Sequence, residues 1–109
     1  MSAIIVTGDD VTLPVTLKKD SATFTIPVSA TVKTAIVSPN RDQVLIPASL
    51  SSDTASGADW ANSLIIATFS STETSKVTNY GDAILEIQVN DSGKTTWFTS
   101  LIIEKGSIT

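Results

Sequence analysis

Short runs of alternating apolar and polar residues, each followed by a turn signal, recur along the whole 109-residue sequence. In residues 8–19, GDDVTLPVTLKK, the apolar residues Val11, Leu13, Val15 and Leu17 alternate with polar residues or proline. A period of two places successive side chains on opposite faces of a β-strand. We therefore expect strands, and not helices, over most of the chain.

Eight runs have the Val, Ile, Thr and aromatic content that is typical of strands. They are residues 2–7, 10–18, 23–28, 31–38, 43–50, 62–70, 82–89 and 95–104. Residues 90–93, Asn-Asp-Ser-Gly, predict a tight hairpin between the last two runs. Short strands at this spacing predict an all-β fold, an immunoglobulin-like antiparallel β-sandwich of about seven to eight strands. A chain of this length buries one core, so we expect residues 1–109 to form a single domain.

One polar segment, residues 69–82, departs from the strand pattern. Ser70 followed by Glu73 matches a capping box, so we expect one short helical turn near 71–77. Tyr80 then stands directly before a predicted strand. In immunoglobulin-like sandwiches a tyrosine at this corner bonds through its hydroxyl to the preceding connection. The alternative is a half-buried Tyr80 that closes one end of the core.

Pro14 interrupts the run 10–18, where a central strand would need a backbone donor. Within a sheet, proline belongs on an edge strand, at the start of a strand or at a bulge, so we expect this run near an edge. Pro27 and Pro47 interrupt two further runs, and such prolines keep exposed edges from pairing with stray chains. The functional alternative is an edge kept for one strand of a neighbouring protein, which makes Pro14 a candidate interface residue.

The sequence contains no cysteine and no histidine. Disulfides, thiol nucleophiles, Ser-His triads and the usual zinc ligands are therefore excluded. The 11 acidic residues are dispersed mainly over predicted turns, without the spacing of a calcium loop or of a catalytic carboxylate pair. We expect neither an enzyme nor a bound metal or cofactor.

Charge and hydropathy narrow the choice of partner. The net charge is −4, with only seven Lys and Arg residues, so nucleic acid is not expected as a partner. No apolar run approaches the roughly 20 residues that a membrane span needs, and no cleaved leader is recognisable. We therefore expect a protein that is made in the cytoplasm and has no membrane partner.

Large apolar side chains occupy both parities of two runs, LIIATF at 64–69 and WFTSLII at 97–103. A strand of a two-layered sandwich needs only one apolar face. Because only 17% of the residues are charged and the mean hydropathy is +0.23, we expect the monomer to expose an apolar patch of the kind that marks a protein interface. The interface candidates for this second face are Phe98, Ile102 and Ile65.

A long polar stretch, residues 51–62, carries Trp60. This tryptophan is either inserted into the sandwich or offered to a partner, which makes it a further interface candidate. A carbohydrate- or ligand-binding sandwich would instead use Trp60 or Trp97 as a stacking platform. Aromatic residues make up only 6% of the chain, which is few for a sugar-binding surface.

The segments GDDVTLPVTLKK, TVKTAIVSP, GADWANSLIIATFSSTETSKV, YGDAILEIQV and KTTWFTSLIIEKG together resemble small virion structural proteins of tailed bacteriophages. They are similar to the immunoglobulin-like N-terminal domain of phage baseplate upper proteins, over nearly the whole chain. The LEIQV strand before a TWF strand, and the GADW loop before an apolar strand, carry the similarity. The resemblance implies a non-enzymatic module that docks onto other virion proteins, and it supplies no site residues beyond the fold.

Free-standing sandwiches of this size in tailed phages are often capsid decoration or cement proteins, which clamp neighbouring shell subunits. The resemblance therefore implies a virion protein, with capsid decoration as the first role and a tail, neck or baseplate adaptor as the second. Phage capsid or tail proteins are the expected partners, with the chain itself a homo-oligomer or bound to the lattice. The apolar ends, residues 2–6 and 101–109, are either arms or ordinary strands.

Overall fold

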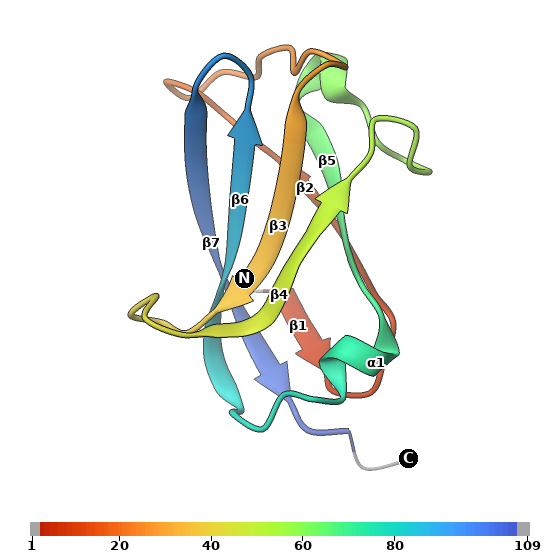
Figure 1. Cartoon of the computed structure of the whole chain (residues 1–109), viewed down its shortest axis with the longest axis vertical. Helices are drawn as coiled ribbons and strands as arrows, with labels where there is room; N and C mark the ends of the chain where they lie inside the picture. The colour runs from red at the N-terminus through yellow and green to blue at the C-terminus, as the bar shows by residue number, and fades with distance from the viewer. Residues whose placement is uncertain (1–2, 107–109) are drawn as a thin grey trace.

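Seven β-strands form two facing sheets in the computed structural model, which describes residues 3–106 (Figure 1). They are β1 (Ala3–Val6), β2 (Val11–Thr16), β3 (Thr31–Val37), β4 (Val44–Ser51), β5 (Leu64–Phe69), β6 (Gly81–Asn90) and β7 (Lys94–Glu104). A 3₁₀ turn, η1 (Trp60–Asn62), and a short helix, α1 (Ser71–Thr74), lie in the connections. The predicted all-β sandwich is confirmed. The C-terminal part of the proposed arm, residues 107–109, and the first residue of the N-terminal one, Ser2, lie outside the described residues.

The two sheets are unequal in size. One has five strands in the order β1-β7-β6-β3-β4, and the other has only β2 and β5. The chain crosses between the sheets from β1 to β2, from β2 to β3, from β4 to β5 and from β5 to β6, as in immunoglobulin-like sandwiches. β1 is the exception to the antiparallel pairing, since it runs parallel to β7 with Ala3 opposite Leu101 and Val6 opposite Glu104. This pair ties the two ends of the sequence together.

Alternate positions of the strands fill the space between the sheets. On β6, the inward residues Ala83, Leu85, Ile87 and Val89 are buried, and the residues between them are partly exposed. The largest fully buried side chains are Ile5, Ile26, Ile36, Ile46, Ile65, Leu85, Ile87, Leu101 and Ile103. Burial of these apolar surfaces is the main favourable contribution to folding, so the period of two in the sequence directly determines the core.

Residues 23–28, which we expected to be a strand, do not form one. Pro27 has no backbone donor for a ladder. The Ile26 amide donates to the Trp60 carbonyl at 2.8 Å, and the Thr25 hydroxyl donates to the Ala61 carbonyl at 3.1 Å. The segment is therefore tied to η1 by single hydrogen bonds and not by a strand ladder. Of its apolar side chains, Ile26 is buried in the core.

Pro14 lies on the exposed edge of the two-stranded sheet. β2 pairs with β5 alone, and Pro14 is opposite Ile66. The Leu17 amide donates to the Ser63 carbonyl at 3.0 Å, so alternate residues of this segment turn their amides toward β5 and Pro14 turns its nitrogen away. The proline therefore removes no bond from the ladder, and the expected edge position of residues 10–18 is confirmed.

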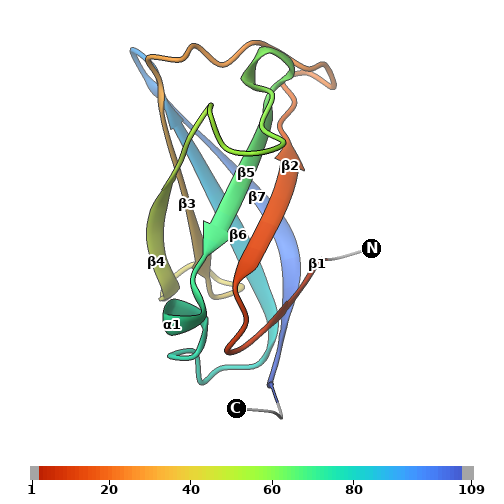
Figure 2. The same cartoon turned by 90° about the vertical axis from the view of Figure 1, so that its right-hand side faces the viewer.

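β5 is buried on both faces. Ile65 points between the sheets, and Ile66 points outward but is also buried. The connection from β4 to η1 lies across the outer side of β5 (Figure 2). A Cβ added to Gly57 in this connection would lie 3.7 Å from Cδ1 of Ile66, and the Ser51 hydroxyl donates to the Ile66 carbonyl at 2.8 Å. The apolar residues on both parities of 64–69 therefore serve internal packing.

The expected helical turn forms as α1. The Ser70 side chain accepts a hydrogen bond from the Glu73 amide at 3.3 Å, as in one half of a capping box. Tyr80 stands directly before β6, where a corner tyrosine would lie, but it is 49% exposed. It is not among the residues that pack against the core, so the structure supports neither the corner role nor the closing of the core for Tyr80.

Candidate protein-binding face

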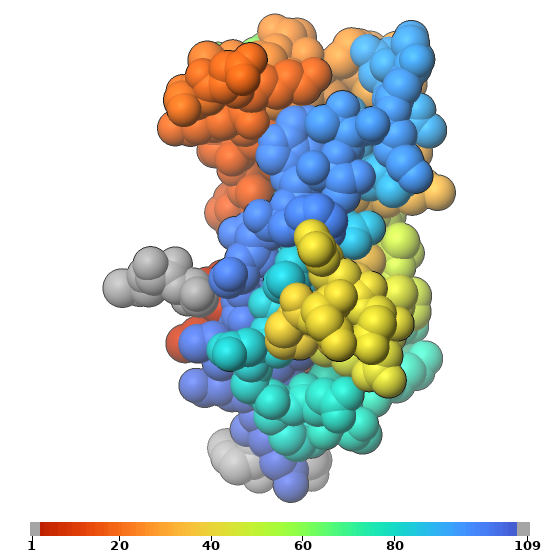
Figure 3. Space-filling view, turned by 90° about the vertical axis from the view of Figure 1, so that its left-hand side faces the viewer, coloured from red at the N-terminus to blue at the C-terminus, as the bar shows by residue number. Residues whose placement is uncertain are grey.

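The outer face of the five-stranded sheet carries an apolar patch. We call Ile4, Ile84, Phe98 and Ile102 the outer patch; Figure 3 looks onto the side of the molecule where the outer face of this sheet lies. Ile4 is opposite Ile102, and Ile84 is opposite Ser100, so Ile84 lies diagonally between Phe98 and Ile102. Ile4 is 54% exposed and Phe98 is 46% exposed, whereas the other two are half-buried. The register therefore places the four side chains beside one another, directly or diagonally, on the same face of the sheet.

Strand parity places these side chains outside. Leu101 and Ile103 point into the core, so Ile102 between them points outward, and Phe98 shares its parity. The same rule turns Ile4 outward beside the buried Ile5. The prediction that Phe98 and Ile102 face away from the core therefore agrees with the structure. In contrast to Ile66 on the outer side of β5, Phe98 on this face of β7 stays largely exposed.

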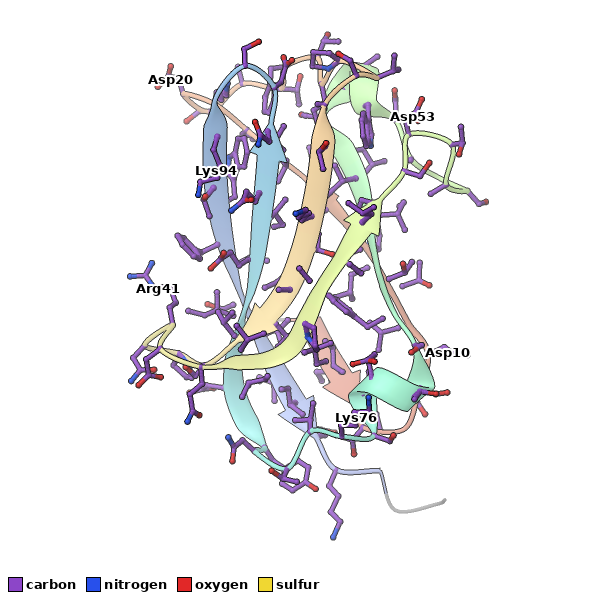
Figure 4. All side chains as sticks on the ribbon, in the orientation of Figure 1. Asp10, Asp20, Arg41, Asp53, Lys76 and Lys94 are labelled. Atoms are coloured by element: carbon purple, nitrogen blue, oxygen red, sulfur yellow. The ribbon has the colours of Figure 1, made fainter. Side chains whose placement is uncertain are left out.

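A loop from the far side of the sheet reaches one member of the outer patch. The guanidinium carbon of Arg41 lies 4.5 Å from the centroid of the Phe98 ring. Figure 4 labels Arg41 on the connection between β3 and β4, which swings toward β7. A cation over an aromatic ring stabilises such a contact by about 0.5–1 kcal/mol at an exposed site. The contact holds the Phe98 ring in place and adds a positive charge beside it.

The loop that carries Arg41 is held by its own hydrogen bonds. The Ser38 hydroxyl lies 2.8 Å from Oδ1 of Asn40 and 3.0 Å from Oδ1 of Asp42, and it accepts from the Gln43 amide at 3.2 Å. Arg41 itself has a positive φ of 63°. A strained residue is kept in this conformation only when its surroundings hold it there, so the position of Arg41 is built into the loop.

Acidic residues complete the surroundings of the outer patch. On β6, Glu86 is opposite Phe98 and Asp82 is opposite Ile102. Together with Arg41 they form a charged border around an apolar centre. An apolar centre within a polar rim is the usual composition of a protein interface. This arrangement can bury apolar area against a partner while its rim directs the orientation.

Two of the interface candidates are buried, which corrects the sequence prediction for them. Trp60 is only 6% exposed and packs in the core, so it is inserted into the sandwich. Its indole N–H has no hydrogen-bond partner in the part of the chain that the structure describes. Ile65 is fully buried because it points between the sheets opposite Val15. Neither side chain is available to a partner of the folded monomer.

Trp97 is half-buried and already occupied by neighbours. Its ring stacks on Phe24 with centroids 5.6 Å apart and planes at 11°. Its indole N–H donates to the Lys18 carbonyl at 3.0 Å, and the Lys19 ammonium lies 4.9 Å from the Phe24 centroid. One face of the indole and its single donor are therefore used within the chain. A sugar platform would need both of these groups free.

The remaining candidate, Pro14, is exposed but lies on the other sheet, so it does not belong to the outer patch. Sequence reasoning missed three contributors to this face: Ile4, Ile84 and Arg41. A signal for Ile84 exists, because it stands beside Leu85 and so puts apolar side chains on both parities of β6. The Arg41 contact depends on the path of a loop and has no periodic signal.

Three comparisons with known proteins were made, and no family model, curated protein or solved structure matches the chain. Within residues 3–106, no group of three or more acidic side chains is placed to hold a metal ion. The helices in the same range are too short to cross a membrane.

Proposed function

We propose that this protein is a non-enzymatic structural component of a bacteriophage particle, and that it binds other virion proteins through the outer patch. The observation that carries the proposal is an apolar surface on a rigid sheet, with a charged rim. Exposed apolar area is unfavourable in water, and a partner that covers it gains about 25 cal/mol for each Å² removed from solvent. The sequence resemblance to tailed-phage virion proteins supports the choice of partner.

Within the particle, we place the protein first among capsid decoration proteins. A single small sandwich offers each neighbour a limited contact, and such a contact becomes stable when many copies bind a repeating shell. A decoration protein needs a firm body and one adhesive face, and both are present here. A tail, neck or baseplate adaptor would use the same face in fewer copies.

Copy number distinguishes these roles. The measurement is quantitative mass spectrometry of purified particles of the phage whose genome encodes this chain, with the major shell protein as reference. Copies comparable to the shell protein support decoration. A few copies, in multiples of three or six, support an adaptor in the neck, tail or baseplate. Absence of the protein from the particles contradicts the proposal as a whole.

The outer patch can be tested by one substitution. We expect Phe98→Asp to weaken binding to the particle at least tenfold, because a central aromatic side chain often contributes about 2 kcal/mol or more and about 1.4 kcal/mol is tenfold. Val28→Asp is the matched control, since Val28 is an exposed apolar residue outside the outer patch. Binding is measured by co-sedimentation of each variant with particles that lack the wild-type protein.

Thermal unfolding of both variants separates binding from folding. Phe98 is half-exposed, so its replacement should leave the midpoint close to that of the wild type. Equal binding by Phe98→Asp and Val28→Asp would show that the outer patch is not the contact surface.

A further inference from the structure

We infer that the free part of the β7 edge, residues 94–98, pairs with the same edge of a second copy in an antiparallel dimer. This contact is separate from the outer patch, because it uses backbone groups in the plane of the sheet. β1 pairs only with Leu101–Glu104 of β7, so the preceding half of the strand has β6 on one side and no described strand on the other.

The other described edges of the sandwich are short or guarded, and the outer edge of β1 is only four residues long. Pro14 faces outward on β2. Beside β4, the Ser49 and Ser51 hydroxyls donate to the Thr68 and Ile66 carbonyls at 2.9 and 2.8 Å, which closes the gap to β5. Natural sheets guard edges in such ways to prevent unwanted pairing. The β7 segment TTWFTS, residues 95–100, has no proline, no charge and no bulge.

The outward-turned groups of this edge can be identified. The Thr7 amide donates to the Glu104 carbonyl at 2.9 Å, so Glu104 turns its peptide groups toward β1 and away from β6. Because the pairing with β6 has no register shift, residues of the same parity do likewise. Thr96 and Phe98 therefore offer their backbone N–H and C=O groups to an incoming strand, whereas the Ser100 carbonyl faces the Ala3 amide in the parallel register with β1.

The surface is hollowed beside the end of this edge, at Thr99 and Ser100, whereas the Trp97 side chain contacts Lys18 and Phe24. A hollow of about 270 Å³ separates β7 from β2, and none of the side chains that line it is ionisable. Leu13, Val15, Thr99 and Leu101 are among these side chains. Figure 3 looks toward this side of the molecule, with β7 in blue beside the yellow loop. An uncharged, self-complementary edge suits a second copy, because a twofold axis satisfies both edges at once and brings no like charges together within 95–100.

β1 limits the register of this pairing. The partner strand must stop level with Ala3, which already occupies the position beside Leu101. An antiparallel overlap of residues 94–98 avoids β1 and puts Thr96 on the twofold axis, with Lys94 opposite Phe98. Lys94 would then lie near the Phe98 ring of the second copy, and Glu86, which is opposite Phe98, offsets the positive charges of Lys94 and Arg41.

The strength of this dimer follows from its size. Two short strands bury less than the roughly 800 Å² per partner of a stable interface, so the isolated protein should dimerise weakly. A particle that holds copies close together would raise their effective concentration and favour the same pairing.

Single-cysteine variants test the register, since the chain has no native cysteine. Paired residues of an antiparallel ladder have Cα atoms about 5.5 Å apart, within the range of a disulfide. We expect oxidised Thr96→Cys to form covalent dimers. Ser100→Cys is the matched control on the same edge, because its two copies would lie roughly 27 Å apart at about 3.4 Å per residue. Thr12→Cys, on the guarded β2 edge, gives the background rate of cross-linking by random collision.

The cross-linking rates decide the inference. Faster dimer formation by Thr96→Cys than by both controls supports the inference. A Thr96→Cys rate no higher than that of Thr12→Cys overturns it, and so does faster cross-linking of Ser100→Cys alone.

A proline substitution provides a second readout. Thr96→Pro removes an outward N–H but no bond to β6, as Pro14 does on β2, so the sandwich should still fold. Sedimentation at high concentration should show loss of the dimer in Thr96→Pro and retention in Thr96→Val. A Thr96→Pro protein that unfolds at the wild-type temperature and still dimerises overturns the inference. Failure here leaves the copy-number and Phe98→Asp results untouched, so the two proposals are judged separately.

Discussion

At the scale of single residues, two buried hydroxyls hold distant loops of the sandwich together. Thr74 Oγ1 accepts from the Gly8 amide at 3.1 Å and donates to the Asp9 carbonyl at 2.8 Å, so it links α1 to the β1–β2 turn. Ser63 donates to the Leu17 carbonyl at 2.6 Å. The sequence shows these residues only as members of polar stretches, because a partner 46 or 65 positions away leaves no local pattern.

The link through Thr74 can be measured. Thr74→Val keeps the shape of the side chain but leaves the Gly8 amide and the Asp9 carbonyl without their partner. We expect the free energy of unfolding to fall by about 1–3 kcal/mol, as measured by urea denaturation. Thr74→Ser keeps the hydroxyl and should retain more of the stability. A Thr74→Val protein as stable as Thr74→Ser would show that these bonds contribute little.

At the scale of elements, β5 and β7 show what sequence reasoning can and cannot reach. Both were identified as strands with apolar residues on two parities. The connection from β4 covers the second face of β5, whereas the second face of β7 stays exposed as part of the outer patch. The pattern along a strand predicts that two faces are apolar. Whether a loop or a partner covers the second face depends on contacts between segments distant in sequence.

The prediction of residues 23–28 as a strand failed for a related reason. Its composition is typical of a strand, and Ile26 is buried as expected. A strand also needs a neighbour to pair with, and the two-stranded sheet has no further strand there. Strand positions, the edge location of Pro14 and the helical turn were predictable because each has a local cause. The parallel pairing of β1 was not, and the sequence left open whether Trp60 is inserted or offered to a partner, because both depend on tertiary packing.

β1 offers an element-scale prediction. Only four residues long and at the sheet edge, it is held mainly by Ile5, which is buried in the core. We expect Ile5→Ala to lower the free energy of unfolding by about 2–5 kcal/mol. Ile4→Ala, next along the strand but pointing outward, should change it by less than about 0.5 kcal/mol. Urea denaturation compares the two, and similar losses would mean that β1 does not seal the core.

At the scale of the whole molecule, a modest negative charge accompanies the exposed apolar surface. The net charge is −4 at pH 7 and the isoelectric point is near 4.4. As the pH falls toward that point, mutual repulsion between copies vanishes and the outer patch can associate freely. We expect light scattering to be greatest near pH 4.4 and to be lower there for Phe98→Asp. Scattering that does not change with pH would contradict this.

The parallel pairing of β1 and β7 also determines how the molecule responds to force. When the chain is pulled from both ends, the two strands are drawn in opposite directions along their length, so all hydrogen bonds between them are loaded in shear together. The Thr7 amide bond to Glu104 and the Gly106 amide bond to the Thr7 hydroxyl, at 2.9 and 3.0 Å, lie in the same load-bearing region. Forced unfolding is governed by the unfolding rate, and bonds that must break together slow it more than bonds that open one by one. A sandwich closed by a parallel pair of terminal strands should therefore unfold more slowly under a force applied to its ends than one whose terminal strands open one hydrogen bond at a time.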